Sequence, residues 1–262
     1  MKKVGIIGLG LIGASILKGL YDKDYELFCY SKSSHKKALN YCKNSSCDIK
    51  VISNCDIIFV CSKASETLEI LDKLNEFLSK KATVVDVCSI KSQLLNKKYN
   101  YNFILSHPMA GSEKNGFEAG NAELFKNCRW LIEKKNKTLE EIISTLGAKP
   151  TKIDMKEHDK LTAQISHLPT ILSFLLFRSA DKNALKIASS GFRDTTRLAM
   201  TNSDLALSMF KENNENILNA FNKLIEELNC LKNLSDDEKI KLFKELAQKR
   251  AKMYDDLGKN TL

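Results

Sequence analysis

The stretch Val4-Gly5-Ile6-Ile7-Gly8-Leu9-Gly10-Leu11-Ile12-Gly13 is the most informative part of this chain for predicting the fold of its N-terminal half. Its first residues form an apolar run typical of a buried strand. Its last six follow the spacing G-x-G-x-x-G at the start of an apolar helical segment over 11–20. This strand–turn–helix context is what the spacing requires before it indicates a dinucleotide site, because the spacing alone is a weak signal. The alternative is a glycine-rich turn without a ligand.

Each glycine has a physical role in such a turn. Gly8 permits the tight turn, Gly10 lets a pyrophosphate approach the backbone, and Gly13 lets the helix pack closely on the strand. The helix N-terminus then presents free N–H groups and the positive end of its dipole to the phosphates. We therefore predict that this turn binds a dinucleotide through six residues: Gly8, Leu9, Gly10, Leu11, Ile12 and Gly13.

The end of the second predicted strand, 26–30, bears on which dinucleotide is bound. An Asp or Glu at this point ordinarily binds the ribose 2′-hydroxyl of NAD. Here the chain continues with Ser31, Lys32 and Ser33, and residues 29–37 contain no acid. These side chains suit a 2′-phosphate, which favours NADP as the cofactor, or a tolerance of both cofactors. The alternative is that Ser31 binds the 2′-hydroxyl of NAD and the lysines are solvated.

The rest of the first half alternates between strand and helix patterns. The predicted strands are 4–8, 26–30, 56–61, 83–87, 103–105 and 129–132, and the predicted helices are 11–20, 33–42, 66–78 and 138–146. Alternating βα units predict a doubly wound, mainly parallel α/β sheet. We therefore predict a Rossmann dinucleotide-binding domain over residues 1–152.

The second half, residues 153–262, shows only helical periodicity. The predicted helices are 154–180, 183–199, 203–231 and 236–256, the first opened by a capping box formed by Asp154 and Glu157. A helical half of this length usually packs on something, and symmetric dimers are the commonest oligomers. We predict an all-α domain for dimerisation and substrate binding, and hence a homodimer through these helices.

Composition excludes several classes of protein. The 262 residues carry a net charge of +9, but the lysines are dispersed, which indicates solvated faces more than a nucleic-acid surface. No apolar run is long enough for a bilayer, and the N-terminus lacks a secretory signal, so we expect a cytoplasmic protein without a membrane partner. The eight cysteines contain no Cys-x-x-Cys pair, so we interpret them as reduced, buried thiols and expect no metal.

One of the four histidines stands in a conspicuous position. His107 lies in Ser106-His107-Pro108-Met109-Ala110-Gly111-Ser112-Glu113, just past the carboxyl end of a predicted strand, where open α/β sheets bind ligands. A histidine there can accept a proton from a substrate hydroxyl near neutral pH. The alternative is a capping histidine in a loop.

Several segments together resemble the prephenate/arogenate dehydrogenase family. The segment 106–117 resembles the family's His-Pro-Met-Ala-Gly-[Thr/Ser]-Glu motif. It is supported, in order along the chain, by Asp86-Val87-Cys88-Ser89-Ile90-Lys91, Ala122-Glu123-Leu124-Phe125, His158-Asp159, Ser166-His167-Leu168-Pro169 and Gly191-Phe192-Arg193-Asp194-Thr195-Thr196-Arg197-Leu198-Ala199. The resemblance implies a prephenate dehydrogenase. Such an enzyme converts prephenate to 4-hydroxyphenylpyruvate by oxidative decarboxylation, with hydride transfer to NAD(P)+, in tyrosine biosynthesis.

The resemblance also implies roles for particular residues. His107 matches the histidine that hydrogen-bonds the C4 hydroxyl of the substrate, and Ser89 matches the serine that orients it. Arg197 matches an arginine that binds a substrate carboxylate, a task that suits its planar fork. His167 matches an active-site histidine, and Ser112 of the His107 motif is predicted with them to bind substrate.

Alternative interpretations of these residues remain open. Arg197 could form a surface ion pair with Asp194, and Arg193 could be a second cation or simply solvated. On a straight helix His158 lies half a turn out of phase with His167, so we prefer His167 for the site and place His158 at the domain junction or in solvent. A kink at Pro169 would weaken this argument.

The chain also departs from the family pattern. Residues 202–206 read Asn-Ser-Asp-Leu-Ala, without the Pro and Trp that often follow the arginine motif, which puts specificity for the ring in doubt. Arogenate dehydrogenase is the close alternative. Another NAD(P)-dependent hydroxy-acid dehydrogenase or an imine reductase is a weaker one, since neither needs the His107 motif. A basic protein that senses dinucleotides or binds nucleic acid is weaker still.

Overall fold

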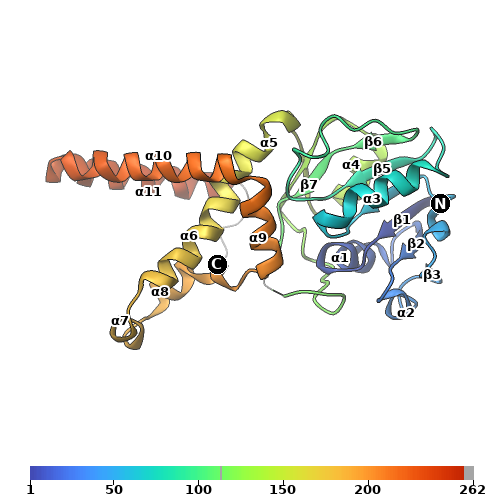
Figure 1. The fold of residues 1–262 in the computed structure, drawn as a ribbon, viewed down its shortest axis with the longest axis horizontal. Helices are drawn as coiled ribbons and strands as arrows, with labels where there is room; N and C mark the ends of the chain where they lie inside the picture. Colours follow the sequence, from blue (N-terminus) through green and yellow to red (C-terminus); the bar gives the residue numbers. More distant parts are fainter. Residues whose placement is uncertain (113, 257–262) are drawn as a thin grey trace.

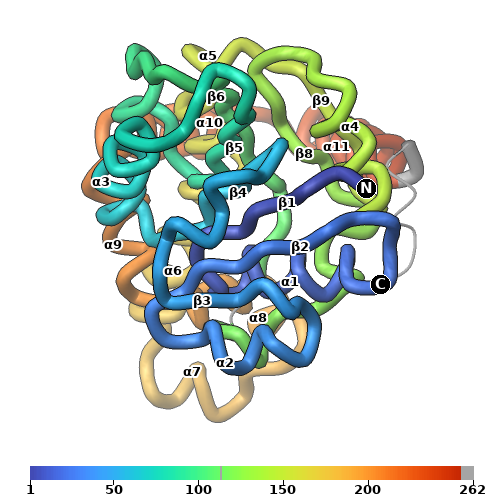
Figure 2. Tube along the Cα trace, turned by 90° about the vertical axis from the view of Figure 1, so that its right-hand side faces the viewer, coloured from blue at the N-terminus to red at the C-terminus, as the bar shows by residue number. Residues whose placement is uncertain are grey.

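A computed structural model describes residues 1–112 and 114–256, arranged as a sheet domain followed by a helical domain (Figure 1). The sheet has six parallel strands in the order β3-β2-β1-β4-β5-β6, which Figure 2 shows from bottom to top. Their bounds are β1 Lys2–Ile7, β2 Tyr25–Tyr30, β3 Asn44–Ser46, β4 Ile57–Val60, β5 Thr83–Asp86 and β6 Asn102–Ile104. This is the doubly wound order of dinucleotide-binding sheets, so the predicted fold class is confirmed.

Two hydrophobic cores cover the two faces of this sheet. Successive β1 residues alternate between them: Ile6 packs with α1 (Leu11–Leu20) and α4 (Lys137–Thr145), and Ile7 packs with α3 (Ala64–Asn75) and the short helix η1 (Ile49–Ile52). A strand with helices on both faces must be apolar on both, which explains the unbroken apolar runs of β1 and β4. The remaining short helix, α2, covers His35–Ala38 and is shorter than the predicted 33–42.

The turn between β1 and α1 has the geometry that only glycine accepts. Gly8 has a φ of +84°, and a Cβ there would lie 2.7 Å from the carbonyl oxygen of Cys61. A Cβ on Gly13 would lie 1.9 Å from the carbonyl oxygen of Gly8. The first requires the left-handed conformation and the second a close helix–strand approach, as the fingerprint predicts.

A second, three-stranded sheet follows the first. It contains β7 (Ser106–Pro108), β8 (Arg129–Ile132) and β9 (Lys149–Lys152), with β7 antiparallel and β9 parallel to β8. Of these three strands only β8 was predicted, because β7 and β9 are short and lack an apolar run. The short strand β3 of the first sheet was not predicted for the same reason. The buried Trp130 of β8 donates from Nε1 to Ser106 Oγ at 3.0 Å. This bond links the start of β7 to the hydrophobic core that contains Trp130.

The described residues after β9 are helical or in connecting turns, as predicted for an all-α domain. The elements are α5 Met155–Thr162, η2 Ala163–His167, α6 Leu168–Ser179, α7 Lys182–Lys186, α8 Ser190–Thr195, η3 Arg197–Met200, α9 Ser203–Glu212, α10 Asn214–Asn233 and α11 Asp236–Asp256. Asp154 is the N-cap of α5, but its side chain accepts from the Lys156 N–H at 2.9 Å, so the predicted reciprocal box with Glu157 is not formed.

Three of the four predicted helices are interrupted. The first contains the π-helical segment η2, where the Leu168 N–H bonds to the Ala163 carbonyl five residues earlier. Pro169 follows at once and has no N–H to continue an α-helical ladder, which accounts for the break. The predicted 183–199 helix is broken into α7, α8 and η3, and 203–231 is divided at Asn213. Helical periodicity alone does not reveal such breaks.

The last two helices are poorly covered by the rest of the chain. Figure 1 shows α10 and α11 running away from the sheet domain. Among the α11 residues whose exposure is described, none is buried, although the helix contains several apolar side chains. The described part of the chain contains no helix long and apolar enough to cross a membrane.

Candidate functional site

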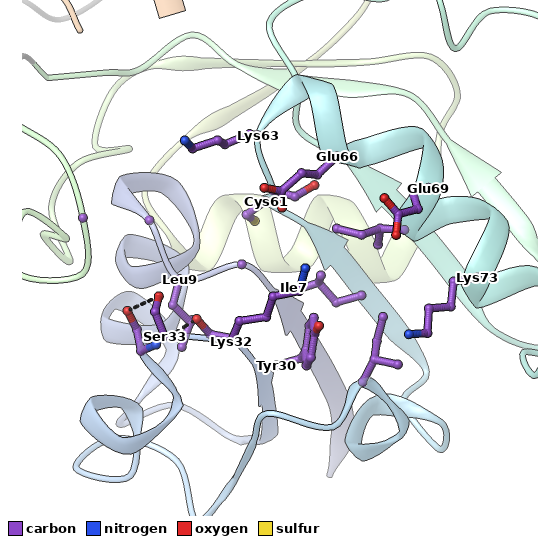
Figure 3. A pocket seen from close by; sticks show the side chains of 18 residues that line it. Ile7, Leu9, Tyr30, Lys32, Ser33, Cys61, Lys63, Glu66, Glu69 and Lys73 are labelled. Atoms are coloured by element: carbon purple, nitrogen blue, oxygen red, sulfur yellow. Dashed lines mark hydrogen bonds between the residues drawn. The ribbon is translucent and has the colours of Figure 1, made fainter. Parts of the chain in front are cut away.

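A cavity of about 370 Å³ lies at the carboxyl ends of β1 and β4, where the strand order reverses (Figure 3). It is lined by the glycine turn, the end of β2 and the start of α3. Around a Cβ built on Gly10 there is nothing within 4 Å, so the backbone of the turn is open to a bound group. The α1 N-terminus directs N–H groups at this space, so the chain's own residues fit a dinucleotide pyrophosphate.

The end of β2 supplies the predicted polar residues to the same cavity. Figure 3 shows Lys32 and Ser33 on one side, facing Glu66, Glu69 and Lys73 from α3 on the other. Ser31 is buried, and its Oγ accepts from the Ser34 N–H at 3.0 Å. The structure thus brings Ser31 and Lys32 to the glycine turn. The α3 carboxylates were not predicted, because only the tertiary structure places that helix beside the end of β2.

His107 lies in β7 with 9% of its surface exposed, next to a second histidine. Its Nδ1 is 2.9 Å from His158 Nε2, and His158 Nδ1 is 2.7 Å from Asp159 Oδ1. The prediction placed His158 at the domain junction or in solvent and preferred His167 for the site; the straight-helix phase behind that preference does not apply, because η2 interrupts the helix between the two histidines. His158 is fully buried at the junction of the two domains, in contact with the candidate proton acceptor.

The electrostatic surroundings keep His107 neutral. Burial lowers the pKa of His107 well below its ordinary value, and electrostatic interactions with the Lys91 ammonium and with the neighbouring rings of His158 and His167 lower it further. A neutral imidazole can accept a proton, so the site holds a base that is ready at neutral pH.

Asp159 joins the helical domain to the loop after β5. Its Oδ1 accepts from the Lys91 N–H and its Oδ2 from the Ser92 N–H, both at 2.8 Å. Burial alone would raise the pKa of Asp159, but the hydrogen bonds from His158 and these two N–H groups outweigh it and hold the pKa below its usual value. Asp159 is therefore an ionised carboxylate with three donors.

The loop that Asp159 holds carries the predicted Ser89. Ser89 is half-buried, three residues past the end of β5, and no hydrogen bond from its side chain to His107 is seen in the described residues. Lys91 is fully buried and pairs with Asp86, which also accepts from the Ser106 N–H at 3.1 Å. The neighbours of Ser89 and His107 thus share Asp86, which places the two segments side by side.

His167 is buried in η2 and has a defined orientation. The Asn213 amide nitrogen lies 3.1 Å from His167 Nδ1 and donates to the Asp159 carbonyl at 2.7 Å. An amide nitrogen only donates, so His167 Nδ1 accepts and Nε2 carries the proton. That N–H has no partner among the residues described. Burial lowers the pKa of His167 to about 4, so it is a neutral donor available to a ligand oxygen.

Arg197 lies in a different cavity, which the structure does not join to His107. This second space of about 1100 Å³ is lined only by residues of the helical domain. It contains Arg197 beside Arg178 and Arg193, together with three phenylalanines: Phe174, Phe177 and Phe192. Asp194 pairs with Arg193 (Nε–Oδ1 2.9 Å) and not with Arg197, so the alternative ion pair of Arg197 is not formed.

The remaining predicted features are peripheral. Ser112 is exposed, and its Oγ accepts from the Lys114 N–H at 3.2 Å; Glu113 of the same motif lies outside the described residues.

The described residues contain no cluster of three or more potential metal ligands. Within the described residues none of the eight cysteines forms a disulfide, but Cys47 and Cys230 are exposed, so the prediction of burial is wrong for these two.

Comparison with known proteins gives a consistent result. A family model described as prephenate dehydrogenase, nucleotide-binding domain, matches residues 20–151, and one described as prephenate dehydrogenase, dimerization domain, matches residues 154–249. The prephenate dehydrogenase of Lactococcus lactis subsp. cremoris (strain MG1363) is 34% identical, over 95% of this chain and 76% of that protein.

Two solved structures resemble the whole chain. Synechocystis arogenate dehydrogenase superposes with a TM-score of 0.80 at 29% identity, covering 96% of this chain and 99% of that one. The prephenate dehydrogenase from A. aeolicus, solved with hydroxyphenyl propionate and NAD+, superposes with a TM-score of 0.83 at 26% identity, covering 97% and 98%.

Proposed function

The chain belongs to the prephenate dehydrogenase family, and from this premise we propose that it converts prephenate to 4-hydroxyphenylpyruvate and carbon dioxide, using His107 as the proton acceptor. The observation that carries the proposal is the state of His107. It is a buried imidazole held by a hydrogen bond at Nδ1, with a depressed pKa. A base of this kind accepts a proton at neutral pH.

The chemistry assigns His107 two proton transfers. A nicotinamide cofactor held at the glycine turn would supply the acceptor for the hydride that leaves C4 of the substrate ring. His107 Nε2 takes the proton of the C4 hydroxyl as that carbon is oxidised. Loss of the ring carboxylate as carbon dioxide then leaves an aromatic ring with a phenolate oxygen. His107 returns its proton to this oxygen, which restores the neutral base.

The other site residues bind and orient the substrate in this proposal. Ser89, on the loop beside β7, orients the hydroxyl and His107. The neutral His167 donates from Nε2 to a substrate oxygen, since that N–H is buried and without a partner in the described chain. Arg197 and Ser112 are assigned to the substrate on the family resemblance, because the structure places Arg197 in a separate cavity and Ser112 on the exposed stretch after β7. The arginines and phenylalanines around Arg197 suit an anionic ring compound.

For the cofactor we propose NAD(P)+, with a preference for NADP+. Ser31 and Lys32 line the cavity at the end of β2 and suit a 2′-phosphate. Residues 29–37 offer no carboxylate to the 2′-hydroxyl. NAD+ is the cofactor in the A. aeolicus structure, so NAD+ is the alternative that direct comparison must weigh.

We also propose a homodimer formed through the helical domain. Residues 154–249 match a dimerization domain. α11 has no buried residue among those whose exposure is described, and its Ile240, Phe243 and Leu246 are each about half exposed. A lone amphipathic helix gains most of its stability from packing its apolar face, so a second copy is the natural cover.

Arogenate is the second candidate substrate, favoured by the likeness to Synechocystis arogenate dehydrogenase. Arogenate carries an ammonium group where prephenate carries a keto oxygen. The fixed N–H of His167 suits an oxygen and opposes an ammonium, which is also a donor. This favours prephenate if His167 faces the side chain of the substrate.

The test is the rate of reduced-cofactor formation at 340 nm, with prephenate or arogenate crossed against NAD+ and NADP+. We expect the highest kcat/KM with prephenate. His107→Asn should lower kcat by about 10²- to 10⁴-fold, the usual contribution of a general base, without changing the thermal unfolding temperature. Turnover of arogenate alone would keep the mechanism and change the substrate. No turnover with any pair would overturn the proposal.

A further inference from the structure

We propose that His158 and Asp159 are positioning residues for His107, which hold its imidazole with the proton on Nδ1 and the lone pair on Nε2. The inference rests on the proposed function only in taking His107 as the proton acceptor. It assigns a role to two buried residues that the binding and catalytic roles above leave unused.

The argument begins at the Asp159 carboxylate. It receives three hydrogen bonds, from the Lys91 and Ser92 N–H groups at 2.8 Å and from His158 Nδ1 at 2.7 Å. An ionised carboxylate only accepts, so His158 Nδ1 must carry a proton. The two backbone donors fix the carboxylate in place, and with it the direction in which the His158 ring faces.

The same logic passes through His158 to His107. A neutral imidazole with its proton on Nδ1 has a lone pair on Nε2. His158 Nε2 lies 2.9 Å from His107 Nδ1, so when both rings are neutral His107 Nδ1 donates. His107 Nε2 is left with a lone pair, and no hydrogen bond to it is seen within the described ranges 1–112 and 114–256. The chain of three residues therefore selects the tautomer that can take a proton from substrate.

This arrangement also explains why the site needs both domains. His107 and the loop 89–92 belong to the sheet domain, whereas His158 and Asp159 belong to α5. The three side chains of this hydrogen-bonded relay, Asp159, His158 and His107, are all buried, so water does not compete for the bonds between them. Residues that hydrogen-bond the ring of a functional histidine commonly fix its orientation and its tautomer. The packing of α5 on the sheet domain therefore does more than bury His107. It supplies the two residues that fix the tautomer of its imidazole.

Two substitutions at position 158 separate the two bonds of the relay. His158→Asn keeps a donor near Nδ1 for Asp159 but has no acceptor for His107. His158→Gln can place its side-chain oxygen near the former Nε2 and accept from His107 Nδ1. Lys160→Asn, on the exposed face of the same helix, introduces the same residue without touching the relay and is the matched control.

The first readout is independent of turnover. The chain has four histidines, so the imidazole ¹⁵N NMR spectrum of labelled protein without ligands can be assigned by substitution. We expect His107 to be protonated at Nδ1 in the wild type and in Lys160→Asn. We expect a shift toward the Nε2-protonated form in His158→Asn, with His158→Gln close to the wild type.

The second readout is kinetic. We expect His158→Asn to lower kcat by about 10- to 100-fold with little change in KM, and His158→Gln to recover most of that loss. If His107→Asn leaves kcat unchanged, the proposed role of His107 itself is wrong. If His107→Asn lowers kcat but His158→Asn alters neither kcat nor the ¹⁵N shifts of His107, the role of His107 stands and positioning by His158 is overturned.

Discussion

Lys91 and Asp86 form an ion pair in which neither side chain is exposed to solvent. Burial raises the pKa of Asp86, whereas the Lys91 ammonium and the N–H groups of Ser106 and Cys88 lower it. The pair connects the loop carrying Ser89 to the strand carrying His107. It is therefore a structural support for the site, and it makes the loop sensitive to the loss of either charge.

Removing one partner of this pair should be costly. Lys91→Met leaves the Asp86 carboxylate buried without a cation, and we expect the free energy of unfolding to fall by about 3–5 kcal/mol. Urea denaturation followed by circular dichroism measures this. The double variant Asp86→Asn/Lys91→Met removes both charges and should recover part of the loss. A double variant less stable than Lys91→Met would contradict this explanation.

The pH dependence of kcat/KM should follow His107. Its pKa is lowered by burial first and then by neighbouring positive charge, so protonation, which would remove the base, occurs only well below pH 6.5. We expect a flat profile between about pH 6.5 and 8 and a fall on the acid side, measured as initial rates across buffers of constant ionic strength. An acid limb centred at or above pH 6.5 would contradict this assignment.

Cofactor preference should depend on Lys32. If its ammonium contacts a 2′-phosphate, Lys32→Ala should raise the KM for NADP+ by about tenfold and leave the KM for NAD+ nearly unchanged. This effect is at the lower end of the range for a charged hydrogen bond, because Lys32 is exposed to solvent. Ser31→Asp introduces an acid at the end of β2 and should shift the preference toward NAD+. Equal effects of Lys32→Ala on both cofactors would show that the lysine does not read the 2′-position.

Substrate binding should depend on Arg197. We expect Arg197→Ala to raise the KM for prephenate by about 10- to 100-fold, with a smaller change in kcat, because a charged hydrogen bond to a carboxylate is lost. Arg197→Lys keeps the charge but not the planar fork and should fall between. Arg129, which is exposed at the start of β8 and does not line the cavity that contains Arg197, provides the control as Arg129→Ala. Equal KM effects at both positions would indicate general electrostatic attraction instead.

The oligomeric state should depend on the apolar face of α11. Phe243 is 53% exposed, and Phe243→Glu would put a charge in a dimer interface. We expect a dimer for the wild type by light scattering and a shift toward monomer for Phe243→Glu. Gln248→Glu adds the same charge at an exposed polar position of α11 and should remain dimeric. A monomeric wild type at micromolar concentration would overturn the proposed assembly.

Features that depend on local pattern could be predicted from the residues alone. The β1 run and the spacing of Gly8, Gly10 and Gly13 predicted a Rossmann turn, because a φ of +84° and a helix–strand contact at Gly13 leave no room for a side chain. The alternation of apolar runs predicted the parallel sheet, and the change of period after residue 150 predicted the helical half. His107 could be singled out because it follows a strand at the ligand-binding edge of the sheet.

The assembly of the site, in contrast, depends on how the two domains pack. The π-helical segment lies between His158 and His167, so the phase of a straight helix does not relate them, and the packing of the two domains brings His158 onto His107. Strands as short and polar as Asn44–Ser46 form because neighbouring strands supply hydrogen bonds, not because of their own propensity. The relay from Asp159 to His107 joins residues 52 apart along the chain. Hydrogen-bond geometry between such distant residues is set by how two domains pack, which no local pattern encodes.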